Sequence, residues 1–116
     1  MTETYQGKCH CGAVQFTVEL DSLDSFYCNC SYCKRRSATL IRVDEDKFTL
    51  TSGESNLGVY GSRDFSKHYF CKTCGINCFT KLTRETGNAT VVNTGCIDEI
   101  EFDSLSPSLF DGANKL

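Results

Sequence analysis

The sequence predicts an all-β domain that is held together by zinc, and three observations support this. Apolar residues mostly alternate with small or polar ones, as do Val14, Phe16, Val18 and Leu20 in the segment 13–20, and such alternation is typical of a half-buried strand. No stretch has the pattern of a long amphipathic helix. Seven of the nine cysteines fall into three tight clusters, an arrangement typical of a zinc protein.

The length and the even composition predict one domain over residues 1–116. The chain has a single proline, Pro107, and no repeat or low-complexity linker divides it. A domain of this size buries little apolar surface, so a structural metal ion would supply stability that the core lacks.

Short strands separated by clusters of Gly, Asp, Asn and Ser make up the predicted domain. After the segment 13–20, we expect strands at 25–28, 39–43, 48–52, 56–60, 68–70, 77–82 and 90–94. The tail from 103 to 116 is rich in Ser, Asp and Asn, and we expect it to lie across the surface, held by Leu105, Leu109 and Phe110.

Charge and cysteine usage restrict the partners and the compartment. The formal charge is −3 with neutral thiols, and seven thiolates with two zinc ions would bring it to about −6, which argues against nucleic-acid binding. No apolar run approaches the roughly 20 residues that span a bilayer, so we expect no membrane contact.

The odd cysteine count, the short Cys-x-Cys spacing and the absence of a signal peptide argue against a secreted disulfide scaffold. We expect reduced thiols and a cytoplasmic location.

Two cysteine pairs predict a closed structural zinc site. Cys9 and Cys11 project two sulfurs to the same side of an extended segment. Cys71 and Cys74 form a Cys-x-x-Cys turn followed by Gly75, where a left-handed backbone would leave N–H groups facing the sulfurs. Four thiolates complete a tetrahedral zinc site, which would close a loop of about 60 residues. The alternative, that each cysteine packs as a small apolar residue, does not explain two matched pairs.

The middle cluster predicts a second zinc site with an open position. Cys28, Cys30 and Cys33 supply three thiolates, and no fourth cysteine lies beside them at ligand spacing. An open position on zinc would take water or a thiol substrate as its thiolate, so we take these three residues as the candidate catalytic group. The alternative is a purely structural site, closed by one of Cys78, Cys96, His10 or His68.

Basic residues follow the middle cluster directly. Lys34, Arg35 and Arg36 could hold the carboxylates of an anionic thiol substrate through charge-assisted hydrogen bonds. An ordinary solvated run of charges explains the same three residues equally well.

Four ordered motifs together resemble a known family. They are GKCHCGAVQF at 7–16, CNCSYCKR at 28–35, FCKTCG at 70–75 and VNTGCID at 92–98, and they are similar to those of the glutathione-dependent formaldehyde-activating enzyme family, which also includes centromere protein V. The resemblance implies a tent-like all-β fold similar to zinc-binding Rab exchange factors. It also implies one structural and one exchangeable zinc on the two cysteine groups, and a carbon–sulfur lyase that interconverts S-hydroxymethylglutathione with glutathione and formaldehyde.

Two departures from the family pattern leave other functions open. Cys96 stands where a hydroxyl residue is expected, and Cys78 stands where the family usually has another residue; we expect both to be buried in the core. The first alternative function is a non-enzymatic zinc-binding module for protein interaction. The second is thiol redox chemistry on Cys96, because methionine sulfoxide reductases use a related zinc fold.

Overall fold

The computed structural model describes residues 2–116, apart from the side chains of Ser62 and Phe102. Met1, the first residue of the predicted domain, lies outside the described residues. Within them, ten strands form two sheets, accompanied by two short α-helices, so the predicted all-β class is confirmed. The likeness to Rab exchange factors stays a prediction. No helix in residues 2–116 is long and apolar enough to cross a membrane.

The smaller sheet has three strands in the order β1-β2-β5, and the larger has seven in the order β10-β3-β4-β9-β8-β7-β6. The smaller sheet consists of β1 (Glu3–Lys8), β2 (Gln15–Leu20) and β5 (Phe48–Ser52). The larger consists of β3 (Phe26–Cys28), β4 (Leu40–Asp44), β6 (Leu57–Arg63), β7 (Ser66–Cys71), β8 (Asn77–Leu82), β9 (Ala89–Asn93) and β10 (Ser108–Phe110). The helices are α1 (Ser31–Arg36) and α2 (Gly112–Lys115), with 3₁₀ turns at Glu45–Lys47, Glu54–Asn56, Thr94–Cys96 and Phe102–Ser104.

The seven-stranded sheet has two different faces, because successive residues of a strand point to opposite sides. Phe79 of β8 pairs with Val92 of β9, and both are buried in the core. Their side contacts the smaller sheet, where the ring centroid of Phe16 lies 6.3 Å from that of Phe79. The next pair, Thr80 and Val91, lines a cavity on the opposite face. Alternate residues of β8 and β9 therefore face the core on one side of the sheet and the cavity on the other.

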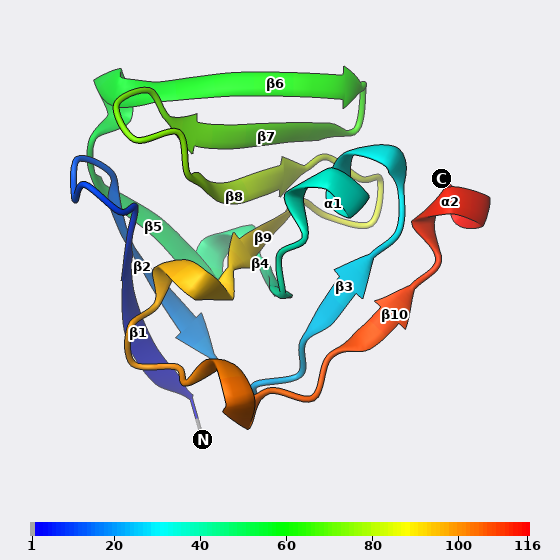
Figure 1. Cartoon of the computed structure of the whole chain (residues 1–116), viewed down its shortest axis with the longest axis horizontal. Coiled ribbons are helices and arrows are strands. Elements are labelled where there is room, and N and C mark those ends of the chain that lie inside the picture. The colour runs from blue at the N-terminus through cyan, green and yellow to red at the C-terminus, as the bar shows by residue number, and fades with distance from the viewer. Residues whose placement is uncertain (1) are drawn as a thin grey trace.

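Helix α1 lies on the cavity side of the larger sheet. In Figure 1 it is seen between β8 and β3, and the C-terminal β10 and α2 lie at the edge of the sheet beside β3. The other edge is β6, which pairs with β7. The cavity is thus bordered by segments from the middle and from the end of the chain.

The predicted strands are present with ends that differ by at most three residues, but β1 was not expected. Its sequence lacks apolar alternation, and Gly7 is its one buried residue. β1 pairs with β2 in antiparallel register from Glu3 opposite Leu20 to Lys8 opposite Gln15. A Cβ at Gly7 would clash with the ring of Phe16, so glycine lets that ring cover the strand. Pairing and a glycine contact, rather than periodicity, define this strand.

The tail lies largely at the surface, as predicted, but its strand β10 was not predicted. β10 forms a parallel pair with β3, which places Phe110 opposite Cys28, and the ring centroids of Phe26 and Phe110 lie 6.4 Å apart. Two hydrogen bonds fix this arrangement, since Asn29 Nδ2 donates to Asp111 Oδ1 at 2.9 Å and the Ala113 N–H donates to Asn29 Oδ1 at 2.9 Å. The tail therefore becomes part of the sheet and reaches the middle cysteine cluster.

Candidate functional site

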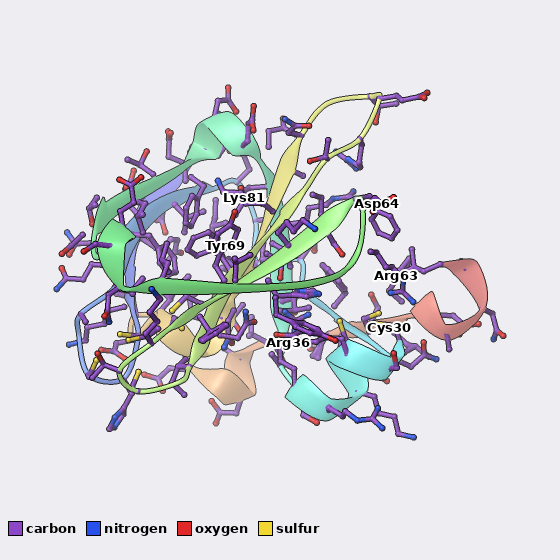
Figure 2. The ribbon with its side chains drawn as sticks, turned by 90° about the horizontal axis from the view of Figure 1, so that it is seen from above. Cys30, Arg36, Arg63, Asp64, Tyr69 and Lys81 are labelled. Carbon is purple, nitrogen blue, oxygen red and sulfur yellow. The ribbon has the colours of Figure 1, made fainter. Side chains whose placement is uncertain are left out.

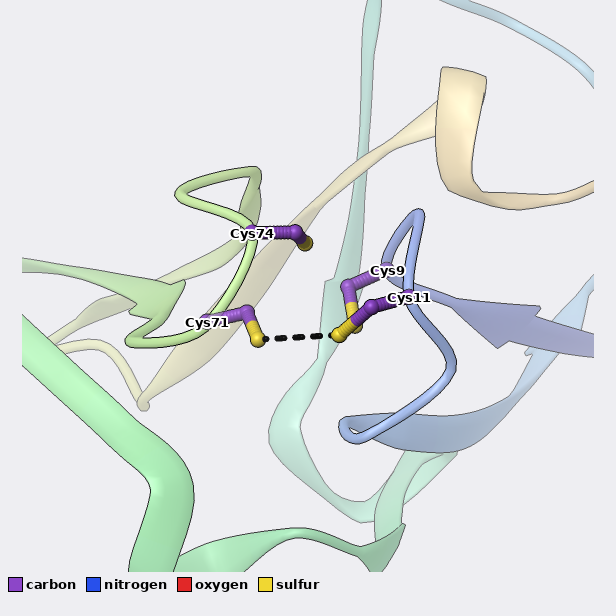
Figure 3. A group of neighbouring side chains, drawn as sticks. All are labelled: Cys9, Cys11, Cys71 and Cys74. Carbon is purple, nitrogen blue, oxygen red and sulfur yellow. Dashed lines mark hydrogen bonds between the residues drawn. The ribbon is translucent and has the colours of Figure 1, made fainter.

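Two loops bring together the four cysteines of the predicted structural site. Cys9 and Cys11 lie in the loop between β1 and β2, and Cys71 and Cys74 lie at the turn from β7 to β8. Their sulfur atoms all lie within 4.8 Å of one another, and Cys11 Sγ lies 3.6 Å from the sulfurs of both Cys9 and Cys71 (Figure 3). Four thiolates at about 2.3 Å from one zinc ion would be roughly 3.8 Å apart. The group fits a tetrahedral zinc ion.

Backbone N–H groups around this cluster point at the sulfurs. The N–H groups of Val14 and Thr73 donate to Cys9 and Cys71, each at 3.3 Å. Hydrogen bonds from backbone N–H groups, that of Ile76 foremost, lower the pKa of Cys74 to about 6. Such donors stabilise thiolates and orient metal ligands. The predicted left-handed turn is also present, because φ of Gly75 is +82°.

The second group is formed by one short segment. Cys28 ends β3, Cys30 is the N-cap of α1, and Cys33 lies within that helix. The three sulfurs lie within 4.8 Å of one another, and no further His, Cys, Asp or Glu of the described residues joins the group. The Cys30 N–H donates to Cys28 Sγ, and the Cys33 N–H donates to Cys30 Sγ, both at 3.4 Å. The group could hold a metal ion with three protein ligands.

Two arginines neutralise charge on these sulfurs. Arg36 Nη2 donates to Cys33 Sγ at 2.8 Å, and Figure 2 shows Arg63 next to Cys30. Burial acts to raise the pKa of Cys30, but hydrogen bonds from Cys33, Cys28 and the Arg63 guanidinium lower it to about 7. Burial raises the pKa of Cys33 despite the nearby Arg36. Of Cys30 and Cys33, Cys30 therefore forms its thiolate at the lower pH.

A cavity of about 690 Å³ opens over the second cysteine group, and we call it the arginine cavity. Its lining includes all three cysteines and the charged residues Arg36, Arg42, Arg63, Arg84 and Asp24. Four arginines and one aspartate give the lining a formal charge of +3. Three thiolates with a divalent ion would reduce this to +2, so the cavity would still attract anions.

His68 lies in the wall of the arginine cavity, in contact with α1. Its ring stacks on Tyr32 with a centroid distance of 3.7 Å, and its Nδ1 lies 2.8 Å from Thr80 Oγ1. Burial, helped by the charges of Arg36 and Arg63, lowers the pKa of His68 to about 4. The ring is therefore neutral at pH 7, with Nε2 left to interact with a ligand.

The structure places only one of the three predicted basic residues at the cavity. Arg36 lines it, whereas Lys34 and Arg35 are exposed and are not part of its lining. The three further arginines were not predicted as part of a binding site, and His68 was considered only as a possible fourth ligand of the second group. No local signal marked them, because which face of a strand borders the cavity depends on the order of the strands in the sheet.

The residues proposed as alternative ligands do not close the second group. Cys78 is fully buried and Cys96 is 4 % exposed, and both belong to the core as expected. Among the described residues, His68 and His10 also lie outside both cysteine groups. Instead, the tail contacts the second group, because a Cβ at Gly112 of α2 would lie 2.6 Å from Cys28 Sγ.

Comparison with known proteins agrees with this geometry. The family model for the glutathione-dependent formaldehyde-activating enzyme matches residues 4–110. The chain belongs to this family. A curated relative from Penicillium rubens, provisionally named a glutathione-dependent formaldehyde-activating enzyme, is 29% identical over 84 residues. That match covers 67% of this chain and 44% of the fungal protein, so the chain spans less than half the length of this relative.

A solved structure shares the fold of this formaldehyde-activating enzyme family member. The crystal structure of a Rhodobacter sphaeroides protein superposes with a TM-score of 0.80 at 31% sequence identity. The superposition covers 90% of this chain and 99% of that chain. The two-sheet arrangement described above is therefore also that of an experimentally determined protein.

Proposed function

We propose that this family member is a zinc-dependent carbon–sulfur lyase of the S-(hydroxymethyl)glutathione synthase type, which adds a thiol such as glutathione to formaldehyde or a related small aldehyde. One observation carries the proposal. Three cysteine sulfurs with no fourth protein ligand among the described residues lie in a cavity that is rich in arginine. Such a group can hold a metal ion and still leave a position for a substrate.

Two zinc ions per chain belong to the proposal. Cys9, Cys11, Cys71 and Cys74 would hold a structural zinc, whose four protein ligands leave no position for a substrate. A zinc ion on Cys28, Cys30 and Cys33 would supply an exchangeable position that holds a thiol as its thiolate near neutral pH. Three thiolate ligands make such an ion a poor Lewis acid, so activation of the aldehyde falls to residues of the chain.

The arginines hold and orient the anionic thiol. Arg36 is hydrogen-bonded to Cys33, and Arg63 lies close enough to Cys30 to lower the pKa of its thiol, so both guanidinium groups lie where a substrate sulfur would enter. Arg42 and Arg84 line the same cavity and can form charge-assisted hydrogen bonds with the carboxylates of glutathione. Fixing the thiol beside the aldehyde lowers the entropic part of the barrier.

His68 supplies a neutral hydrogen-bond donor for the aldehyde oxygen. Thr80 Oγ1 accepts from Arg36 Nη1 at 3.2 Å, so its own hydrogen is available for His68 Nδ1, and the ring proton then lies on Nε2. As the S–C bond forms, the electron pair of the C=O bond moves to oxygen, where the Nε2–H group stabilises it. The thiol proton leaves to solvent, and the oxygen takes a proton from water. The reverse sequence breaks the S–C bond.

The other two functions have less support. A purely structural module would need a closed second group, and no fourth protein ligand from the described residues completes it. Redox chemistry on Cys96 would need an accessible nucleophile, but this side chain is 4 % exposed. The cavity over the second group therefore favours an enzyme.

The test is exchange between glutathione and its formaldehyde adduct. Magnetisation-transfer NMR at neutral pH measures the exchange rate with and without zinc-loaded protein. We expect the protein to accelerate exchange, Cys30→Ser to abolish the acceleration, and the matched buried-cysteine variant Cys78→Ala to retain it. Exchange at the uncatalysed rate with the native, two-zinc protein would refute the lyase proposal.

A further inference from the structure

We propose that the arginine cavity selects anionic thiol adducts that carry an extended apolar group on sulfur, so that aldehydes with an apolar chain or ring are better substrates than formaldehyde. This inference rests on the proposed lyase function, because it assigns the substrate class of the same site. The argument has four steps, which concern the size, the wall, the far end and the charge of the cavity.

The cavity is large enough for a glutathione adduct that carries a further group on its sulfur. Its volume of about 690 Å³ lies in the range of about 300–1,000 Å³ that holds drug-sized ligands. A hydroxymethyl group adds only one carbon and one oxygen to the substrate sulfur. The remainder of glutathione is polar, with two carboxylates and two amides, and gains little from apolar walls.

One wall of the cavity is apolar. It is formed by side chains from β3, β8, β9, β10 and the β6–β7 turn, namely Phe26, Phe65, Leu82, Val91, Leu109 and Phe110. Two of these are large apolar side chains that remain partly exposed, since Leu109 is 51% and Phe65 is 37% exposed. Partly exposed apolar side chains that converge on a concave surface are typical of a ligand site.

The far end of this wall holds a buried polar atom without a partner. Ser25 is 8 % exposed, lines the cavity, and its Oγ has no hydrogen-bond partner among the described residues. Ser25 is three residues before Cys28, which corresponds to about 10 Å along an extended chain. Arg36 Nε, at the sulfur end, is also buried without a partner. Buried polar atoms are nearly always satisfied, so the two atoms indicate that the cavity is occupied at both places, by water or by a ligand that extends from the sulfurs past Phe26.

Charge and apolar surface adjoin each other along the cavity. Arg36 Nη2 donates to Cys33 Sγ at 2.8 Å, and Arg42 lies opposite Val91 in the sheet. The guanidinium carbon of Arg63 lies 6.0 Å from the ring centroid of Phe65. A ligand that complements this lining carries both anionic groups and an apolar group. The adduct of glutathione with an aliphatic or aromatic aldehyde has this chemistry.

Binding of stable thioethers tests the cavity separately from catalysis. Calorimetric titration of the zinc-loaded protein compares S-hexylglutathione with S-methylglutathione, neither of which can release an aldehyde. Full burial would give roughly a fourfold gain in affinity per methylene, so we expect S-hexylglutathione to bind at least about tenfold more tightly. Equal affinities, or weaker binding of the hexyl compound, would overturn the inference.

A matched pair of variants tests whether the hexyl group binds in the cavity. Leu109→Ser should weaken S-hexylglutathione binding roughly three- to tenfold and leave S-methylglutathione unchanged. Val59→Ser changes an apolar strand residue that is 55% exposed and lies outside the cavity lining, and it should change neither affinity. Phe65→Ser serves as the second cavity variant if Leu109→Ser does not fold. Equal losses of S-hexylglutathione affinity in the cavity and control variants would refute the proposal that the cavity binds the hexyl group.

Turnover completes the test and separates the two proposals. Exchange rates measured with hexanal and with formaldehyde should give a higher kcat/KM for hexanal. Acceleration with formaldehyde but not with hexanal, together with equal thioether affinities, would refute the substrate class and leave the lyase intact. Selective thioether binding without acceleration for either aldehyde would refute the lyase and with it the claim about substrates.

Discussion

Replacing Cys71 by Ser removes one ligand of the four-cysteine group and should cost the protein a large part of its stability. Cys11 and Cys71 are 60 residues apart in sequence, and a cross-link that closes such a loop contributes about 4 kcal/mol through the entropy of the unfolded chain. A domain of 116 residues has a total stability of roughly 6–17 kcal/mol. At about 4 °C per kcal/mol, the melting temperature should fall by roughly 15 °C or more.

The assay combines thermal unfolding with zinc analysis, and the control is Cys78→Ala. Both cysteines are fully buried, but Cys78 belongs to neither group, so its replacement should cost only about 1–2 kcal/mol for the lost sulfur. We expect Cys71→Ser to lose one zinc per chain and Cys78→Ala to lose none. The reasoning is refuted if Cys71→Ser keeps its full zinc content, or if it melts within a few degrees of the Cys78→Ala protein.

Three further variants probe the second group and the cavity. Cys30→Ser should lose one zinc per chain and melt near the native temperature; an unchanged zinc count would contradict the assignment of ligands. Gly112→Ala should release zinc to a chelator faster than the native protein does, because the new Cβ would lie 2.6 Å from Cys28 Sγ; unchanged release would show that α2 does not support the group. The pKa of His68 is depressed from 6.5 to about 4, so its stabilising contribution is complete above pH 6.5 and is lost as pH falls toward 4. Chemical denaturation should show that His68→Gln removes about 2 kcal/mol of the stability change between pH 7 and 5; parallel pH profiles for variant and native protein would count against the buried neutral ring.

Much of the fold follows from the sequence because most strands bury one face. Phe16 and Val18 of β2 are buried while Gln15 and Glu19 are exposed, and this alternation is visible in the sequence. The exceptions are strands β1 and β10, which lack it. β1 depends on pairing with β2 and on the contact of Gly7 with Phe16. Such nonlocal pairing has no local sequence signal.

The candidate site was predictable only in its local parts. The partition of seven cysteines into groups of four and three follows from spacing, because ligands of one ion must be close in space and two of the three clusters are tight turns. Arg63 and His68 reach the cavity from β6 and β7, and nothing in their neighbouring residues shows this. Only the order of strands in the sheet places them over α1.

The difference between the two groups in loop length gives a physical reason for the different roles proposed for them. The first group joins segments 60 residues apart, so a metal ion held there would restrict the whole unfolded chain and could not leave without a large loss of stability. The second group lies within the segment 28–33, which is held by hydrogen bonds in α1 and by contacts of Asn29 with Asp111 and Ala113. A metal ion would not be needed to hold these ligands in place, because they close almost no loop. A site of this kind can exchange a ligand, or the ion itself, while the fold persists, and that is the property a thiol-binding site at a metal requires.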